Sequence, residues 1–179
     1  MSSFAAVGFG IVSLLESSVP GRQRMADAPE SLVQPRHEAL LASTVIGCLS
    51  TLRHTDGRIS TNPVSYRWNG AQIEISTLKG RMKYKNMVAD PRATLCVVSP
   101  RDPMHYVEMR GRVRLVDDPD RSLFAAHFRA TSGGIEPPEG MDAPGAERVM
   151  IYLTPEQVSS PQMYGGQFDD FGEKFYSRD

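Results

Sequence analysis

Short apolar runs separated by turn dipeptides dominate the middle of the chain and predict antiparallel β-structure. Residues 45–54 form an apolar run typical of a buried strand, and the Asp-Gly dipeptide at 56–57 indicates a tight hairpin turn. The returning strand is predicted at 58–69. An Asn-Gly dipeptide at 69–70 then leads into an alternating segment at 71–77. Two such turns so close together predict a three-stranded antiparallel meander.

The rest of the chain adds three strands and three helices to this prediction. The expected strands are 93–99, 105–118 and 148–155, and the expected helices are 35–43, 80–90 and 119–131. Pro63 cannot donate to a strand ladder, so we expect an edge, a bulge or a bend there. Six antiparallel strands with peripheral helices favour a small, mainly β barrel, because closure removes exposed edges. An open α+β sandwich is the alternative.

The two ends of the chain are expected to lie outside a single domain at 31–160. The apolar run at 4–15 is shorter than the roughly 20 residues that a membrane span needs, and no basic residue precedes it. Met25 opens a segment that reads like a natural start. We therefore interpret residues 1–30 as a disordered extension or a misassigned start, and residues 161–179 as a polar, aromatic tail.

Composition narrows the classes of partner. The net charge is −1, with 40% hydrophobic and 23% charged residues, which is typical of a soluble globular protein. Such a chain has no global attraction for nucleic acid or an anionic membrane, so we expect neither as a partner. Cys48 and Cys96 each lie in a strand-like run, where we expect buried free thiols in a cytoplasmic protein.

A basic cluster at one strand-to-helix corner is the strongest chemical signal. Hydroxyls at Ser76 and Thr77 and the free N–H groups of a helix starting after Gly80 would face one spot, which favours a small anion. On an ideal helix Arg81 and Lys83 lie about 200° apart, so they serve one phosphate only where the corner is irregular. A solvated helix face is the alternative. The five basic residues are Lys79, Arg81, Lys83, Lys85 and Arg92.

The order of short motifs adds a family resemblance. The segments T-N-P-V-S-Y at 61–66, I-S-T-x-x-G-R-x-K at 75–83 and D-P-R-A-T-L at 90–95 resemble those of the split β-barrel flavin and deazaflavin oxidoreductases. These are relatives of pyridoxamine 5'-phosphate oxidase, and the branch that uses coenzyme F-420 is the more similar one. The likeness covers roughly residues 35–155. It implies an FMN-binding-like, six-stranded split barrel that forms homodimers, with cofactor sites between the subunits.

The resemblance also assigns roles to individual residues. It implies that Ser76, Arg81 and Lys83 hold the cofactor phosphate and the start of its anionic tail. Three further residues would line the wall against the ring. Tyr106, and more loosely Met104 and His105, would approach the ring, and the proton for the reaction would come from solvent or from Tyr106 as a positioned acid. The wall residues are Ser60, Pro63 and Val64.

The implied activity is hydride transfer from reduced deazaflavin to an electron-poor organic small molecule. Two alternatives remain on the same fold: an FMN-dependent oxidase or reductase, and a non-catalytic flavin- or haem-binding protein. The histidines have neither ligand spacing nor nearby acidic or thiol partners at metal-site intervals, so no metal site is expected. They are His37, His54, His105 and His127.

Overall fold

A computed structural model of the chain describes residues 32–102 and 105–160. The predictions made for residues 1–30, for Met104 and for the tail at 161–179 lie outside these ranges. The elements are α1 (Pro35–Ser43), β1 (Ile46–Leu52), β2 (Ile59–Ser65), β3 (Arg67–Trp68), β4 (Ile73–Leu78), α2 (Met82–Ala89), β5 (Arg92–Val98), β6 (Tyr106–Asp117), α3 (Ser122–Thr131) and β7 (Arg148–Ser159).

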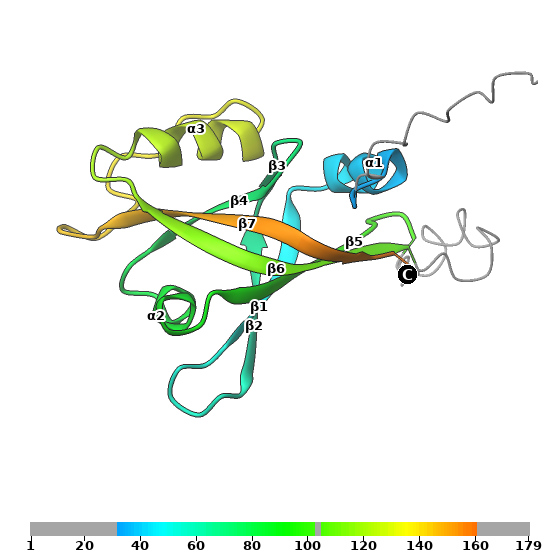
Figure 1. Ribbon diagram of the computed structural model, residues 1–179. Helices are drawn as coiled ribbons and strands as arrows, with labels where there is room; N and C mark the ends of the chain where they lie inside the picture. Colours follow the sequence, from blue (N-terminus) through cyan, green and yellow to red (C-terminus); the bar gives the residue numbers. More distant parts are fainter. Residues whose placement is uncertain (1–31, 103–104, 161–179) are drawn as a thin grey trace, which may run out of the picture. The chain divides into compact units, whose positions relative to one another are not determined.

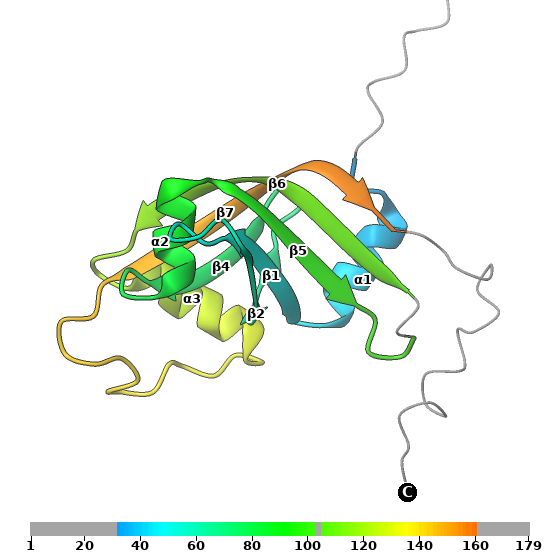
Figure 2. The same ribbon diagram turned by 90° about the horizontal axis from the view of Figure 1, so that it is seen from below.

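All seven strands belong to one antiparallel sheet with the order β2-β1-β5-β6-β7-β4-β3. The sheet curls around an interior and forms a half-barrel, with the helices at its ends and side (Figures 1 and 2). The prediction of a mainly β barrel with peripheral helices is therefore confirmed in outline. None of the described helices is long and apolar enough to cross a membrane.

The predicted strand count of six is wrong, because the segment 58–69 breaks in two at Tyr66. The Tyr66 ring is 1% exposed and its hydroxyl donates to the Leu41 carbonyl at 2.8 Å. Burying this ring turns the chain, so that β2 pairs with β1 and β3 pairs with β4. The predicted meander is correct in its two hairpin pairings, β1 with β2 and β3 with β4, but wrong in its continuity, since β2 and β3 lie at opposite ends of the strand order. Pro63 lies on β2, an edge strand, as expected.

Side-chain alternation places the core inside the curled sheet. Every second residue of β1 and β5 is buried, and the fully buried set includes Leu49, Leu95, Met109, Ile151 and Leu153. Burial of apolar surface on this scale is the main driving force for the fold. Cys48 and Cys96 are cross-strand partners on the opposite face, where Cys48 is exposed and Cys96 half-buried. The prediction that both thiols are buried is wrong, because apolar strand-like runs do not reveal which face a residue occupies.

A close contact between β6 and β7 explains Gly111. The strand register shifts between Arg110 and Gly111, and a Cβ atom at Gly111 would lie 1.9 Å from the Thr154 carbonyl oxygen. Only glycine avoids this clash, and the register shift here is a bulge that lets the sheet curl.

Two buried polar side chains position the helices that flank the site. Asn86 of α2 is fully buried. Its Nδ2 donates to the Thr51 hydroxyl at 3.0 Å, and its Oδ1 accepts from the His54 backbone N–H at 3.2 Å. Asp118 is 1% exposed, and its carboxylate accepts the N–H groups of Leu123 and Phe124 in the first turn of α3. These contacts fix α2 against β1 and α3 against the end of β6.

Candidate functional site

A cleft of about 870 Å³ lies between β2, β4, the start of α2, α3 and the loop that leads into β7. This volume is within the range typical of small-molecule and cofactor sites. Five of the residues predicted from the sequence line the cleft: Pro63, Ser76, Thr77, Arg81 and Lys83. The structure therefore brings together the residues expected to bind the phosphate, and it places the edge-strand proline beside them.

Four predicted residues do not line this cleft. Val64 belongs to the hydrophobic core, and Ser60 is half-buried farther along β2. His105 and Tyr106 lie at the start of β6, whereas the end of β6 at Asp117 is near the cleft. Twelve residues of strand separate the two ends by roughly 35 Å along the strand. Within one chain, His105 and Tyr106 are thus far from the predicted phosphate-binding residues.

The corner before α2 is irregular, so the angle of about 200° that an ideal helix would place between Arg81 and Lys83 does not apply here. Arg81 is the N-cap residue of α2 and has an extended backbone, with φ −77° and ψ 143°. Its side chain is therefore not constrained to the helical spacing from Lys83, and both side chains line the cleft. The backbone N–H groups of Met82 and Lys83 lie in the first turn and have no acceptor among the described residues.

The five basic residues of the cluster differ in their ion pairs. Lys79 lies 3.0 Å from both Asp117 and Glu147, and Arg92 pairs with Asp90. Arg81, Lys83 and Lys85 have no anionic partner in residues 32–102 and 105–160, and of these only Arg81 and Lys83 line the cleft.

Burial and charge at Lys83 point to an anion. Burial lowers the pKa of Lys83, and the neighbouring Arg81 guanidinium lowers it further. Two adjacent cations without a partner anion destabilise each other, and a bound phosphate would relieve this repulsion. The hydroxyls of Ser76 and Thr77, the free N–H groups and the cation pair thus form a set of donors suited to a phosphate.

The opposite side of the cleft, beside α3, carries a basic residue whose charge is paired with a carboxylate of the protein. Arg148 is 9% exposed and forms a two-pronged ion pair with Asp142, with Nε 2.7 Å from Oδ2. Arg121 also donates to Asp142 at 2.8 Å, and the Arg148 guanidinium lies 3.6 Å from the centre of the Phe124 ring. Arg148 lowers the pKa of the Asp142 carboxyl, first through hydrogen bonding and then, together with Arg121 and Arg81, through charge.

His127 is a cleft residue that the sequence analysis did not assign. It is 3% exposed, its Nε2 lies 3.4 Å from the Ser65 hydroxyl, and its buried Nδ1 has no hydrogen-bond partner among the described residues. Burial lowers the pKa of His127 to about 4, so the ring is neutral at pH 7. Asp142 and Phe124 were also missed, because their roles depend on contacts between distant segments.

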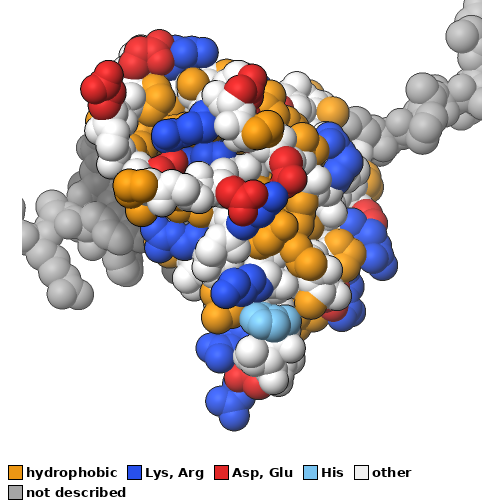
Figure 3. Space-filling model, turned by 90° about the vertical axis from the view of Figure 1, so that its left-hand side faces the viewer, with side chains coloured by type: hydrophobic (Ala, Val, Ile, Leu, Met, Phe, Trp, Pro, Cys, Tyr) orange, Lys and Arg blue, Asp and Glu red, His pale blue; other side chains and the backbone are white. Residues whose placement is uncertain are grey.

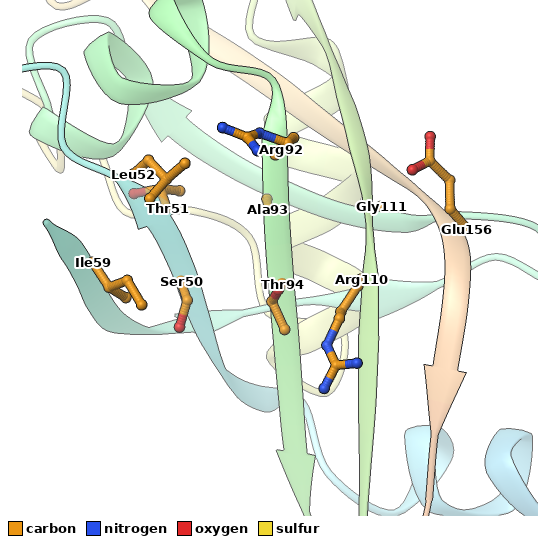
Figure 4. Close-up of a pocket in the computed structure, with 10 residues that line it drawn as sticks. All are labelled: Ser50, Thr51, Leu52, Ile59, Arg92, Ala93, Thr94, Arg110, Gly111 and Glu156. Atoms are coloured by element: carbon orange, nitrogen blue, oxygen red, sulfur yellow. The ribbon is translucent and has the colours of Figure 1, made fainter. Parts of the chain in front are cut away.

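Acidic and basic side chains are interspersed on this side of the molecule rather than forming one continuous basic surface (Figure 3). A second hollow, of about 300 Å³, lies over β1, β2, β5, β6 and β7 (Figure 4). Both of its arginines are paired, Arg92 with Asp90 and Arg110 with Glu108. In the part of the chain that the structure describes, no group of three or more His, Cys, Asp or Glu residues is arranged to hold a metal ion.

The half-barrel and its donor-lined cleft define the fold as a split barrel whose cleft is lined by groups able to donate to an anion. The family profile described as pyridoxamine 5'-phosphate oxidase matches residues 33–160, and the chain belongs to this family. No curated protein sequence matches the chain significantly.

Solved structures agree with this assignment. A structure described as an F420 reductase is 30% identical, with a TM-score of 0.60 over 68% of this chain and 94% of the other. Two more distant structures support the fold alone. One is a putative pyridoxamine 5'-phosphate oxidase from Listeria innocua, 17% identical, with a TM-score of 0.53 over 70% of this chain and 94% of the other. The second is a heme binding protein from Mycobacterium smegmatis, 24% identical, with a TM-score of 0.57 over 77% of this chain and 57% of the other.

Proposed function

We propose that the protein is a coenzyme F-420-dependent oxidoreductase that transfers a hydride between the reduced cofactor and an electron-poor organic substrate. The observation that carries the proposal is the pair Arg81 and Lys83, which line the cleft without an anionic partner in the described chain. The 30% identity to an F420 reductase supports the choice of cofactor. When bound, the deazaflavin supplies the hydride chemistry, and the protein supplies binding and orientation.

In this proposal the α2 corner holds the cofactor phosphate. Arg81 and Lys83 provide charge, Ser76 and Thr77 provide hydroxyl donors, and the first turn of α2 provides backbone N–H groups. The exposed ring of Pro63 lies on the edge strand beside this corner and forms part of the wall. Ser60 and Val64 would contribute through the backbone of β2, since the Val64 side chain is in the core.

Tyr106 and His105 take part only if a second copy of the chain completes the site. We propose a homodimer for this reason. The outer face of the sheet has the character of a protein interface, because it exposes Ile46, Ile59 and Val98 alongside the thiol of Cys48. In such a dimer the proton donor would come from the partner subunit. A cytoplasmic location is likewise a proposal.

An FMN-dependent oxidase or reductase is the second candidate, because the donors of the α2 corner suit the phosphate of either cofactor and the family is described by pyridoxamine 5'-phosphate oxidase. Titration of the purified full-length chain with each cofactor, followed by absorbance and fluorescence, separates the two. We expect tighter binding of coenzyme F-420; tighter binding of FMN would establish the second candidate. A bound cofactor that no acceptor oxidises would indicate a non-catalytic flavin- or haem-binding protein.

The α2 corner is tested by Arg81→Ala and Lys83→Ala. Each variant removes a charge-assisted contact worth about 1.5–3 kcal/mol, so cofactor affinity should fall about tenfold or more. Lys85→Ala is the matched control, because Lys85 lies on the same helix, is exposed and does not line the cleft. Normal binding by both cleft variants would show that the phosphate lies elsewhere.

A further inference from the structure

On the α3 side of the cleft, one carboxylate of the protein itself already pairs with two arginines: Arg148, which lines the cleft, and Arg121, the residue before α3, which does not. Arg148 binds the Asp142 carboxylate through two nitrogens, and Arg121 binds one of the same oxygens. This two-pronged geometry is the one that arginine uses for a carboxylate or phosphate ligand. The Asp142 and Arg148 side chains are 7% and 8% exposed, so little solvent screens the pair.

This arrangement adjoins the proposed phosphate-binding corner. The Arg148 Nη1 atom lies 3.3 Å from the Ser76 hydroxyl, and Ser76, Asp142 and Arg148 all line the same cleft. A ligand anchored at Arg81 and Lys83 would therefore extend toward a cationic position that the protein neutralises.

We infer that Asp142 is a specificity-determining residue, which occupies a second anion-binding position at Arg148 and Arg121 and so reserves the α3 side of the cleft for an uncharged part of the ligand. The inference rests on the proposed use of this cleft as the ligand site.

The loop that carries Asp142 explains why this internal anion prevails. Gly140 and Gly145 on either side of Asp142 have positive φ values of 70° and 77°, which allow the tight turns that direct the loop back to Arg148. A tethered carboxylate competes at an effective concentration in the millimolar range or above. An anionic ligand at a concentration below this effective concentration would not displace the Asp142 carboxylate. An uncharged polar or aromatic group could occupy this side of the cleft without displacing it.

The test uses inorganic phosphate as the probe and the full-length chain in calorimetric titrations. The Arg81→Ala variant serves as the background, because it weakens the first anion position. Adding Asp142→Asn to this background should raise phosphate affinity about tenfold, because it frees Arg148 and Arg121. Asp142→Glu should give no gain, because it keeps the negative charge. Glu136→Gln should also give none, since Glu136 lies in the same loop as Asp142, pairs with Arg129 of α3 and does not line the cleft.

The outcomes separate this inference from the proposed function. Absence of a gain with Asp142→Asn would overturn the inference, provided that circular dichroism shows a folded chain. An equal gain with Asp142→Glu would also overturn it, since loosening of the loop rather than charge would then be responsible. Comparison of Lys83→Ala with the unmodified protein reports on the α2 corner without removing the Arg81 charge, which also acts on Asp142. Its failure would therefore not affect the interpretation of Asp142.

Discussion

The two sides of the cleft use their basic residues in opposite ways. Arg81 and Lys83 at the α2 corner have no acidic partner in the described chain, whereas Arg148 and Arg121 on the α3 side share the Asp142 carboxylate. Arg81 and Lys83 repel each other until an anion binds, whereas removal of either Arg148 or Asp142 would leave a buried charge without its main partner. The comparison teaches that a basic residue near a cleft is informative about ligands only after its internal partners are known.

The largest expected effect tests whether the α3 side is structural. Arg148→Ala would leave Asp142 with only Arg121 as a partner and would remove the contact with the Phe124 ring. Breaking a buried ion pair by removing one partner costs about 3–5 kcal/mol, so urea denaturation should show a loss of stability in that range. Arg112→Ala is the control, because Arg112 and Glu156 are both about 60% exposed; a loss of less than about 1 kcal/mol is expected there. Equal losses of stability in the two variants would show that the Arg148–Asp142 pair contributes no more to the fold than an exposed ion pair does.

The second effect concerns His127 and acid. Its pKa is lowered by burial to about 4, from an ordinary value of 6.5. Between these values the unfolded chain binds a proton that the folded chain does not, so the free energy of unfolding falls as the pH falls from 6.5 to 4. The fall attributable to His127 is on the order of 2–3 kcal/mol. His127→Gln should lose this component in urea titrations at pH 7, 5.5 and 4. Parallel pH curves for both proteins would contradict the neutral state of the ring.

The smallest expected effect links the fold to the α2 corner. Asn86→Ala would leave the Thr51 hydroxyl and the His54 N–H without their buried partner, which should lower stability by about 2 kcal/mol. Because Asn86 fixes the helix that begins beside Arg81, cofactor affinity should fall as well. Val88→Ala on the same helix is 60% exposed and should change neither quantity appreciably. Unchanged affinity in a destabilised Asn86→Ala variant would mean that the corner does not depend on this anchor.

Much of the fold was predictable because it follows from local patterns. The turn dipeptides and apolar runs located six segments that contain the seven described strands, and the edge position of Pro63 is one of the three alternatives expected for it. The break at Tyr66 was not predictable, because it results from a hydrogen bond to Leu41, which lies 25 residues away. The exposure of Cys48 was missed because an apolar run does not specify which face of the sheet is covered.

The candidate site was likewise predictable only where it depends on local sequence. The motif at 75–83 placed hydroxyls and cations at one strand-to-helix corner, and the structure brings them to one cleft. The family resemblance also suggested Tyr106 and His105, which lie at the far end of β6 within this chain. Position in a motif does not specify which subunit a residue serves, so these two assignments remain predictions.

By itself, the amino-acid sequence determined the mainly β class of the protein, its family motifs and the corner where an anion is expected. It did so because turns, strand periodicity and helix starts depend on neighbouring residues. Only the tertiary structure decided which basic residues are free. Lys79 is neutralised by Asp117 and Glu147, which are 38 and 68 positions away, and Arg148 by a carboxylate on a glycine-flanked loop. Charge pairing depends on distances in space, and these emerge only when the sheet has curled and the loops have closed over it.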